Sequence, residues 1–185
     1  MLQTREKIQL MSASEIDRTL VRLAHEILER THDIKLLTFV GIQRGGVPLA
    51  QRLAKKIEDL EDCAVPVGTV RIERYRDDLP ADGQQQPPVV AKPELPFSVN
   101  GRDVILIDDV LHTGRTVRAG LDALMQHGRP ARVQLLVLID RGHRELPIEA
   151  RYVGRTVQTK ASENIDVRFQ EIDGFEKVVL TERVD

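Results

Sequence analysis

The pattern of apolar and polar positions predicts that strands and helices alternate along this chain. Runs of apolar or β-branched residues indicate strands at 34–42, 65–72, 104–107 and 131–139. Apolar residues at helical spacing indicate helices after Ser12, after Gly46 and at 117–126. A strand without polar alternation, as at 104–107, is typical of a parallel sheet that helices cover on both faces. The order therefore predicts an α/β fold with a central, mostly parallel sheet flanked by helices.

Local signals indicate the first helix and the end of the chain. Ser12-Ala13-Ser14-Glu15 is a capping-box signature, and apolar residues follow from Ile16 to Ile27, so a helix of about five turns is predicted. Near the other end, the runs at 165–172 and 175–181 flank Asp173-Gly174. Alternation on both sides of such a turn predicts a small C-terminal β hairpin.

A group of polar residues follows the apolar run at 104–107. We expect the strand to end at Asp108 and Asp109, after which 112–116 supplies hydroxyls, a glycine and an arginine. A loop that leads into a helix binds anions, because its first N–H groups are free and the helix dipole is positive there. Two adjacent carboxylates can accept hydrogen bonds from vicinal sugar hydroxyls. Phosphate and diol together indicate a ribose 5-phosphate.

An ordinary solvated turn is the alternative for the acid pair, and for the pair alone we would favour it. The complete pattern from Val104 to Thr116 is more specific, because the apolar run, both acids, Thr113 and Gly114 fall in register. No Gly-Lys-Ser/Thr P-loop and no Gly-x-Gly-x-x-Gly dinucleotide motif occur. A second loop at 41–46 contains glycines and Arg44 after a predicted strand, so it is placed for a diphosphate group, although such loops are often only turns.

Composition limits the classes of protein that remain. With 185 residues and 41% hydrophobic content, the chain fits a single domain over 1–185. The net charge of -2 gives no overall electrostatic case for nucleic-acid binding. The single Cys63 excludes an intrachain disulfide framework, and histidine and cysteine spacing indicates no dedicated zinc site. No apolar run reaches the roughly 20 residues of a membrane span and no signal peptide is evident, so we expect a cytoplasmic protein.

A proline-rich segment interrupts the alternation of strands and helices. Five of the nine prolines lie between Pro80 and Pro96. Long loops inside a compact domain are usually functional, and a lid is a common case. We therefore predict a flexible lid loop at about 74–100, with a disordered linker as the alternative.

The pattern at 104–116 resembles the phosphoribosyl diphosphate (PRPP) signature of the type I phosphoribosyltransferases. Further stretches make the chain similar to the PyrR family, namely Tyr75-Arg76-Asp77-Asp78-Leu79, Arg129-Pro130-Ala131-Arg132 and Asp140-Arg141-Gly142-His143-Arg144-Glu145-Leu146-Pro147-Ile148. The similarity covers almost the whole chain. PyrR proteins are bifunctional pyrimidine operon regulators with uracil phosphoribosyltransferase activity. Two positions depart from the family pattern: Gln43 precedes Arg44 where threonine is more usual, and Glu149 stands where a basic residue is expected.

The resemblance implies a reaction of uracil with PRPP that gives uridine monophosphate (UMP) and diphosphate. Mg²⁺ would bind through the diphosphate and ribose oxygens, without a dedicated protein site. The implied catalytic residues are Asp108, Asp109 and Arg44, and the lid residues are Tyr75, Arg76, Asp77 and Asp78. The implied PRPP-binding residues are Gln43, Arg44, Gly45, Val104, Ile105, Leu106, Ile107, Asp108, Asp109, Val110, Leu111, His112, Thr113, Gly114, Arg115 and Thr116.

The resemblance also implies contacts to the base around Asp140, Arg141 and 159–166, and a homodimer or homotetramer. A regulator of this family would bind the leader mRNA of a pyrimidine operon in response to UMP or UTP. The RNA-binding candidates that follow from the resemblance are Arg18, Arg22, His25, His143 and Arg144. Helical spacing independently puts the first three on one surface. A solvated helix face is the alternative for the first three. A hypoxanthine/guanine-type phosphoribosyltransferase and a nucleotide-sensing regulator with little catalysis remain open.

Overall fold

A computed structural model describes residues 3–72 and 93–184 of the chain. Its larger sheet has five strands, all parallel, in the order β3-β2-β4-β5-β6. The strands are β2 (Leu37–Ile42), β3 (Val67–Val70), β4 (Asp103–Leu111), β5 (Arg132–Asp140) and β6 (Tyr152–Thr156). The predicted α/β fold with a parallel central sheet is therefore confirmed.

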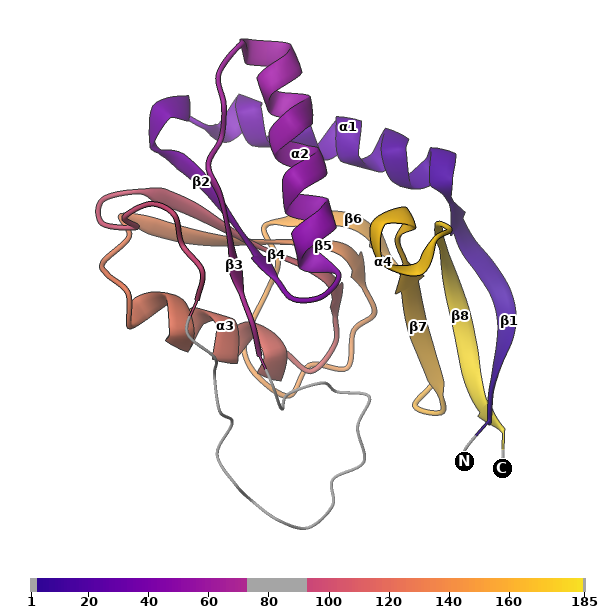
Figure 1. Ribbon diagram of the computed structural model, residues 1–185. Coiled ribbons are helices and arrows are strands. Elements are labelled where there is room, and N and C mark those ends of the chain that lie inside the picture. Colours follow the sequence, from indigo (N-terminus) through magenta and orange to yellow (C-terminus); the bar gives the residue numbers. More distant parts are fainter. Residues whose placement is uncertain (1–2, 73–92, 185) are drawn as a thin grey trace.

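Helices cover both faces of this sheet (Figure 1). α1 (Ala13–Arg30) and α2 (Gly46–Glu61) lie on one side, and α3 (Arg115–Met125) lies on the other. Alternate residues of β4 serve the two sides: Ile105 and Ile107 belong to the core with α1 and α2, while Val104 and Leu106 belong to the core with α3. Both faces of β4 are thus buried, which explains its unbroken apolar sequence.

The predicted start of α1 is confirmed. Ser12 precedes the first helical residue, and both its backbone N–H and its hydroxyl donate to Oε2 of Glu15, at 2.8 and 2.7 Å. The buried residues Ile16, Leu20, Leu23, Ala24 and Ile27 form one face of the helix. This capping box and apolar face are what the sequence pattern predicts.

A second, smaller sheet is antiparallel and lies beside α2 (Figure 1). Its order is β1-β8-β7, with β1 at Gln3–Ser12, β7 at Glu163–Arg168 and β8 at Lys177–Val184. The predicted pairing of the last two strands is confirmed, but 170–172 was wrongly included in a strand. These residues belong to the short helix α4 (Gln170–Asp173). The carboxylate of Asp173, its last residue, accepts a hydrogen bond at 2.9 Å from the N–H of Phe169, the residue that precedes the helix.

Several strand boundaries differ from the sequence expectation. β3 spans only Val67–Val70 of the predicted run 65–72. β4 does not end at the two aspartates but continues to Leu111, because Asp108, Val110 and Leu111 stay paired with β5. The run at 34–42 begins with a 3-10 helix, η1 (Ile34–Leu36), since Asp33 accepts a hydrogen bond from the Lys35 N–H at 3.0 Å. The strand itself starts at Leu37.

The C-terminal part of the segment at about 74–100, predicted as a lid, packs against the folded body. Glu94 exchanges two backbone hydrogen bonds with Thr69 of β3, at 2.9 and 3.0 Å, and Val99 is buried in the core on the α3 side. Residues from Glu94 onward therefore belong to the folded body. Tyr75, Arg76, Asp77 and Asp78 lie outside the described residues.

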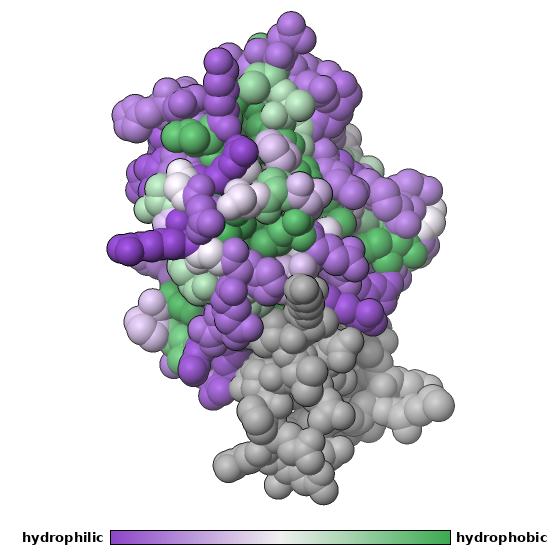
Figure 2. All heavy atoms as spheres, turned by 60° about the vertical axis from the view of Figure 1, so that its left-hand side comes forward, coloured by the Kyte–Doolittle hydropathy of each residue, from purple (hydrophilic) through white to green (hydrophobic). Residues whose placement is uncertain are grey.

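The exposed large apolar side chains within the described ranges 3–72 and 93–184 are scattered over the surface. The large apolar side chains that are exposed there lie on six different elements or their flanks, and they are Ile8, Val21, Leu36, Leu60, Met125 and Phe175. Figure 2 shows one face on which hydrophilic residues predominate around smaller apolar areas. Among the described helices, none combines the length and the apolar composition that crossing a bilayer requires.

Candidate active site

Three loops meet at the edge of the larger sheet where parallel strands end. They are the turn at 43–46 after β2, the segment 108–116 at the end of β4, and the loop 141–148 after β5. We call them the glycine turn, the acid-phosphate segment and the bracing loop. In parallel α/β sheets this edge is where ligands bind.

The glycine turn lies against the acidic residues of β4. A methyl group on Gly45 would come within 2.2 Å of Oδ2 of Asp109, and one on Gly46 within 2.1 Å of the Ile107 carbonyl oxygen. Both distances are far below a van der Waals contact, so only glycine permits this approach. Arg44 is exposed beside these glycines, and its peptide bond with Gln43 is cis. The predicted diphosphate loop and the predicted acid pair are therefore neighbours in space.

The two acids are held by the backbone of their own strand. Asp108 is 5% exposed, and its Oδ1 accepts a hydrogen bond from the Asp109 N–H at 3.0 Å. Oδ1 of Asp109 accepts from the Val110 N–H at 2.9 Å. These contacts orient the carboxylates, and Asp109, which is half-buried, faces the glycine turn.

The acid-phosphate segment leads into α3 as an anion-binding loop requires. Gly114 is the N-cap residue with φ of 91°, a left-handed conformation that favours glycine. Thr113 is buried, and its hydroxyl accepts a hydrogen bond from the Arg115 N–H at 3.2 Å. The first turn of α3 begins directly behind this loop, so its dipole favours a bound phosphate there.

The bracing loop holds the acid-phosphate segment from the side. The carbonyl of Thr113 accepts hydrogen bonds from the N–H groups of Glu145 and Leu146, at 3.0 and 3.2 Å. Nη1 of Arg144 donates to the His112 carbonyl at 2.8 Å, and Nε of Arg115 pairs with Glu145 at 2.7 Å. The predicted phosphate loop is therefore fixed by residues about thirty positions later in the sequence.

A cavity of about 320 Å³ adjoins the bracing loop. The residues that line it are Asp140, Arg141, Gly142, Arg144, Ile148, Glu149, Thr156, Val157 and Gln158. Both predicted base-pocket residues therefore line one hollow, together with residues after β6. Its size, and a mostly apolar surface with a few charged and polar side chains around it, are compatible with a small planar ligand.

Asp140 and Arg141 also have partners within the protein. The Asp140 carboxylate accepts from the Gly142 N–H at 3.0 Å and from Nη2 of Arg144 at 2.5 Å. Arg141 is 5% exposed and reaches the smaller sheet, where it donates to Asn164 at 2.7 Å and to the Glu163 carbonyl at 2.6 Å. Arg141 thus joins the bracing loop to the start of β7.

The RNA-binding candidates lie on two elements. Arg18, Arg22 and His25 are exposed along α1, as their spacing predicts, and Arg22 donates to the carbonyls of Val153 and Gly154 at 3.0 and 2.7 Å. His143 and Arg144 belong to the bracing loop. The His143 ring lies 5.9 Å from the His112 ring, and its Nε2 lies 2.7 Å from the Thr159 carbonyl oxygen.

Comparison with known proteins decides the family. Residues 10–172 match the family of phosphoribosyl transferase domains. The chain is 56% identical to the "Bifunctional protein PyrR" of Pelotomaculum thermopropionicum over 181 residues. These residues make up 98% of this chain and 99% of that protein. It is 54% identical to the protein of the same name from Chloroflexus aurantiacus, over 93% of each chain. The chain belongs to the PyrR family.

Solved structures share the fold of this PyrR-family chain. A hypoxanthine-guanine phosphoribosyltransferase of Bacillus anthracis has a TM-score of 0.73 at 17% identity, covering 97% of this chain and 99% of that one. A hypoxanthine phosphoribosyltransferase of Staphylococcus aureus has a TM-score of 0.69 at 21% identity, covering 94% and 92%. At such identities the likeness concerns the fold alone, so it does not favour the purine alternative over the PyrR family.

Membership of the PyrR family confirms the resemblance that the motifs indicated. It also confirms the prediction that the chain is a phosphoribosyltransferase, an enzyme that transfers a glycosyl group. Sequence reasoning missed the cavity-lining residues at 156–158. It also missed the bracing role of Arg144, which was predicted only as an RNA contact. Motif spacing gives no signal for either, because both depend on contacts between loops that follow different strands.

Proposed function

We propose that this chain transfers the phosphoribosyl group of PRPP to uracil, giving UMP and diphosphate. The observation that carries the proposal is the contact between the glycine turn and Asp109 at the edge of the parallel sheet. It supports the proposal because the loop proposed for the diphosphate lies next to the carboxylates proposed for the ribose hydroxyls, and the loop proposed for the 5-phosphate follows those carboxylates in the chain. Membership of the PyrR family supports uracil as the acceptor.

Each part of the site then has a defined task. Asp108 and Asp109 accept hydrogen bonds from the ribose hydroxyls, and 112–116 holds the 5-phosphate in front of α3. Arg44 and the neighbouring N–H groups hold the diphosphate. Departure of diphosphate leaves an oxocarbenium-like ribose, so the protein contributes mainly by positioning the substrates and by stabilising charge. No covalent nucleophile is needed.

Mg²⁺ belongs to this proposal as a companion of PRPP. In the described residues 3–72 and 93–184, no group of three or more His, Cys, Asp and Glu side chains is arranged to hold a metal. The adjacent carboxylates of Asp108 and Asp109 offer oxygen ligands next to the glycine turn, which suits a cation that keeps several waters. When bound, Mg²⁺ would neutralise charge on the diphosphate. Asp108 and Asp109 would hold it together with the substrate.

A base-selectivity assay tests the proposed acceptor. Nucleotide formation is measured with PRPP, Mg²⁺ and one free base at a time: uracil, hypoxanthine or guanine. We expect UMP to form with the highest kcat/KM. A higher value with either purine would overturn the proposed acceptor, and no turnover with any of the bases would favour a sensing regulator instead.

We propose further that the chain acts as a homodimer or homotetramer and binds the leader mRNA of a pyrimidine operon more tightly with UMP or UTP. Arg18, Arg22 and His25 support this proposal, because they are exposed together along α1. Phosphate contacts dominate nucleic-acid affinity, so binding should weaken steeply as salt is raised. Light scattering measures the assembly.

The contacts of the candidate cations indicate which RNA variants are informative. Arg22 and Arg144 hold backbone carbonyls of their own protein, so replacing them would also disturb the fold. Arg18→Ala/His25→Ala is the better probe, with Arg118→Ala on α3 as an exposed control. In gel-shift titrations with leader and scrambled RNA, only the first variant should lose affinity. Equal affinity for both RNAs would exclude the regulatory part while leaving the transferase intact.

A further inference from the structure

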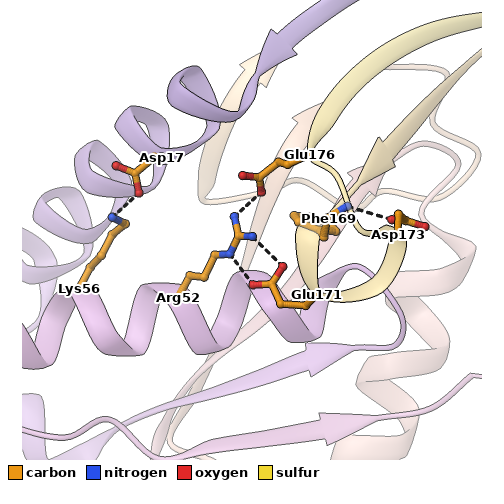
Figure 3. A network of polar contacts seen from close by, with 7 residues as sticks. All are labelled: Asp17, Arg52, Lys56, Phe169, Glu171, Asp173 and Glu176. Carbon is orange, nitrogen blue, oxygen red and sulfur yellow. Dashed lines mark hydrogen bonds and ion pairs between the residues drawn. The ribbon is translucent and has the colours of Figure 1, made fainter.

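The smaller sheet is joined to the body of the protein at both ends of β7. At the start of β7, Arg141 from the bracing loop donates to Asn164 and to the Glu163 carbonyl. Beyond the other end, Arg52 of α2 approaches α4 and the residues around it (Figure 3). Arg141 lines the cavity next to the phosphate loop, whereas Arg52 has no part in the site described above.

Arg52 makes a two-sided contact with two carboxylates. Its Nε and Nη2 donate to the two carboxylate oxygens of Glu171, each at 2.7 Å, and its Nη1 donates to Oε1 of Glu176. A guanidinium bound in this forked manner fixes direction as well as distance. The same guanidinium lies 5.7 Å from the ring centre of Phe169, which is buried in the core shared with α1 and α2.

The position of Arg52 along α2 links this contact to the substrate. α2 begins at Gly46, the last residue of the glycine turn, and Arg52 follows within two helical turns. A rise of about 1.5 Å per residue puts Arg52 roughly 9 Å along the helix from the turn. The helix therefore connects the proposed diphosphate site to the smaller sheet, and β7 connects that sheet to Arg141 at the proposed base site.

The next turn of α2 offers a comparison. Lys56 pairs with Asp17 of α1 at 2.6 Å, so this contact joins the two helices and does not involve the smaller sheet (Figure 3). Lys56 and Arg52 have similar exposure, with 22% and 23% of their side chains accessible. Lys56 therefore serves as a matched control for removal of one ion pair from α2.

We propose that Arg52 is a positioning residue for the base site: it fixes the smaller sheet, and with it the segment leading into β7, relative to the glycine turn. The proposal rests on the proposed uracil phosphoribosyltransferase function. Arg52 does not touch substrate in this arrangement. Its loss should impair the use of the free base more than the binding of PRPP, because PRPP contacts the loops after β2 and β4 and those loops remain in place.

The test compares Arg52→Gln with Lys56→Gln. We expect Arg52→Gln to raise the KM for uracil about tenfold, which corresponds to roughly 1.4 kcal/mol, and to change the Kd of PRPP by less than about twofold. Arg52→Lys keeps the positive charge but cannot form the bidentate contact with Glu171. Its KM for uracil should therefore lie between those of the wild type and Arg52→Gln. Lys56→Gln should leave both constants unchanged. Equal changes for the two substrates, or an unchanged KM for uracil, would overturn the proposal.

Two further measurements keep the test decisive. If Arg52→Gln does not fold, Glu171→Gln is used instead, because it removes the forked contact and leaves Glu176 in place. The KM for uracil should again rise while the Kd of PRPP stays nearly unchanged. Amide hydrogen exchange measures the attachment of the smaller sheet and does not depend on enzymatic turnover. The backbone amides of β7 should exchange faster in Arg52→Gln than in Lys56→Gln. If wild-type protein forms no UMP, the proposed function fails, and unchanged exchange of β7 would separately exclude the positioning role.

Discussion

Gly45 and Asp109 are in such close contact that a methyl group on Gly45 would lie 2.2 Å from Oδ2 of Asp109. The two residues come from the ends of different strands, β2 and β4, which are direct neighbours in the sheet. Because one is in the proposed diphosphate loop and the other in the proposed ribose-binding pair, their contact sets the distance between the two parts of the PRPP site. Variants at Gly45 and Asp109 can therefore test whether this distance matters for the use of PRPP.

Gly45→Ala should reduce activity while leaving most of the stability. The added methyl group would lie 2.2 Å from Oδ2 and 2.8 Å from Cβ of Asp109. Rotation of the side chain moves the carboxylate away but leaves Cβ in place, so the turn must also shift slightly and the carboxylate leaves its position. We expect kcat/KM for PRPP to fall by about tenfold or more, since misplacement of a substrate contact has large effects on rate. Steady-state kinetics and thermal unfolding of the same sample measure both effects.

Gly46→Ala is the contrasting variant. Its methyl group meets the backbone carbonyl of Ile107 at 2.1 Å, and a central strand cannot move aside as a side chain can. Overpacking of this kind typically costs about 1–3 kcal/mol, so Gly46→Ala should lower the free energy of unfolding more than Gly45→Ala does. The reverse order of stability would contradict the arrangement of the glycine turn.

Asp108→Asn and Asp109→Asn should lose transferase activity and stay folded. The amide oxygen can still accept the hydrogen bond from the following N–H group, at 3.0 Å for Asp108 and 2.9 Å for Asp109, so the strand end is preserved. Hydrogen bonds to a charged group contribute about 1.5–3 kcal/mol, which predicts a loss of roughly tenfold to a hundredfold in kcat/KM. Turnover of uracil and PRPP at the parent rate would exclude the ribose-binding role.

The central strands and the acid-phosphate segment could be predicted because their signals are local. The apolar run at 104–107, the acid pair and the helix start all lie within a few residues of one another, and the capping box at Ser12 is a four-residue pattern. β1 could not be predicted in this way. Seven of its ten residues are polar and those at 5–9 are exposed, with Ile8 59% exposed. β1 is therefore stabilised mainly by its pairing with β8 at the other end of the chain.

β6 was missed for a related reason. It has only five residues at the edge of the sheet, and it is held from outside by Arg22 of α1, which donates to two of its carbonyls. The motif at 140–148 was found, but not the partners of its arginines. Arg141 and Arg144 bind groups that follow or precede them by up to thirty-two positions, and no periodicity in the sequence reports such contacts.

Arg144→Met should weaken both the fold and the binding of PRPP. Its guanidinium donates to the His112, Gly142 and Ile148 carbonyls and to Asp140, so the variant leaves several acceptors of the bracing loop without a donor. An unsatisfied acceptor that is fully buried costs about 1–3 kcal/mol, and these acceptors are part-buried, so a loss near the lower end is expected. A looser phosphate loop should also raise the KM for PRPP. Chemical denaturation and steady-state kinetics measure these effects.

Arg118→Met is the control for that variant. Arg118 forms an exposed pair with Asp122 at 3.8 Å on the surface of α3, and such pairs contribute less than about 1 kcal/mol. It should therefore leave stability and kinetics nearly unchanged. If the two variants behaved alike, the bracing role of Arg144 would be wrong.

Acid should loosen the attachment of the smaller sheet. The hydrogen bonds from Arg52 lower the pKa of the Glu171 carboxyl below its usual value of 4.5. A carboxyl whose pKa is lower in the folded state stabilises the fold above the unfolded pKa, and this contribution is lost as the pH falls through the folded pKa. The pair is therefore intact at neutral pH and weakens below about pH 4.5. Thermal unfolding of Arg52→Gln and wild type between about pH 3 and 7 should show the difference in stability shrinking as the pH falls, and a constant difference would mean that Glu171 does not titrate against Arg52.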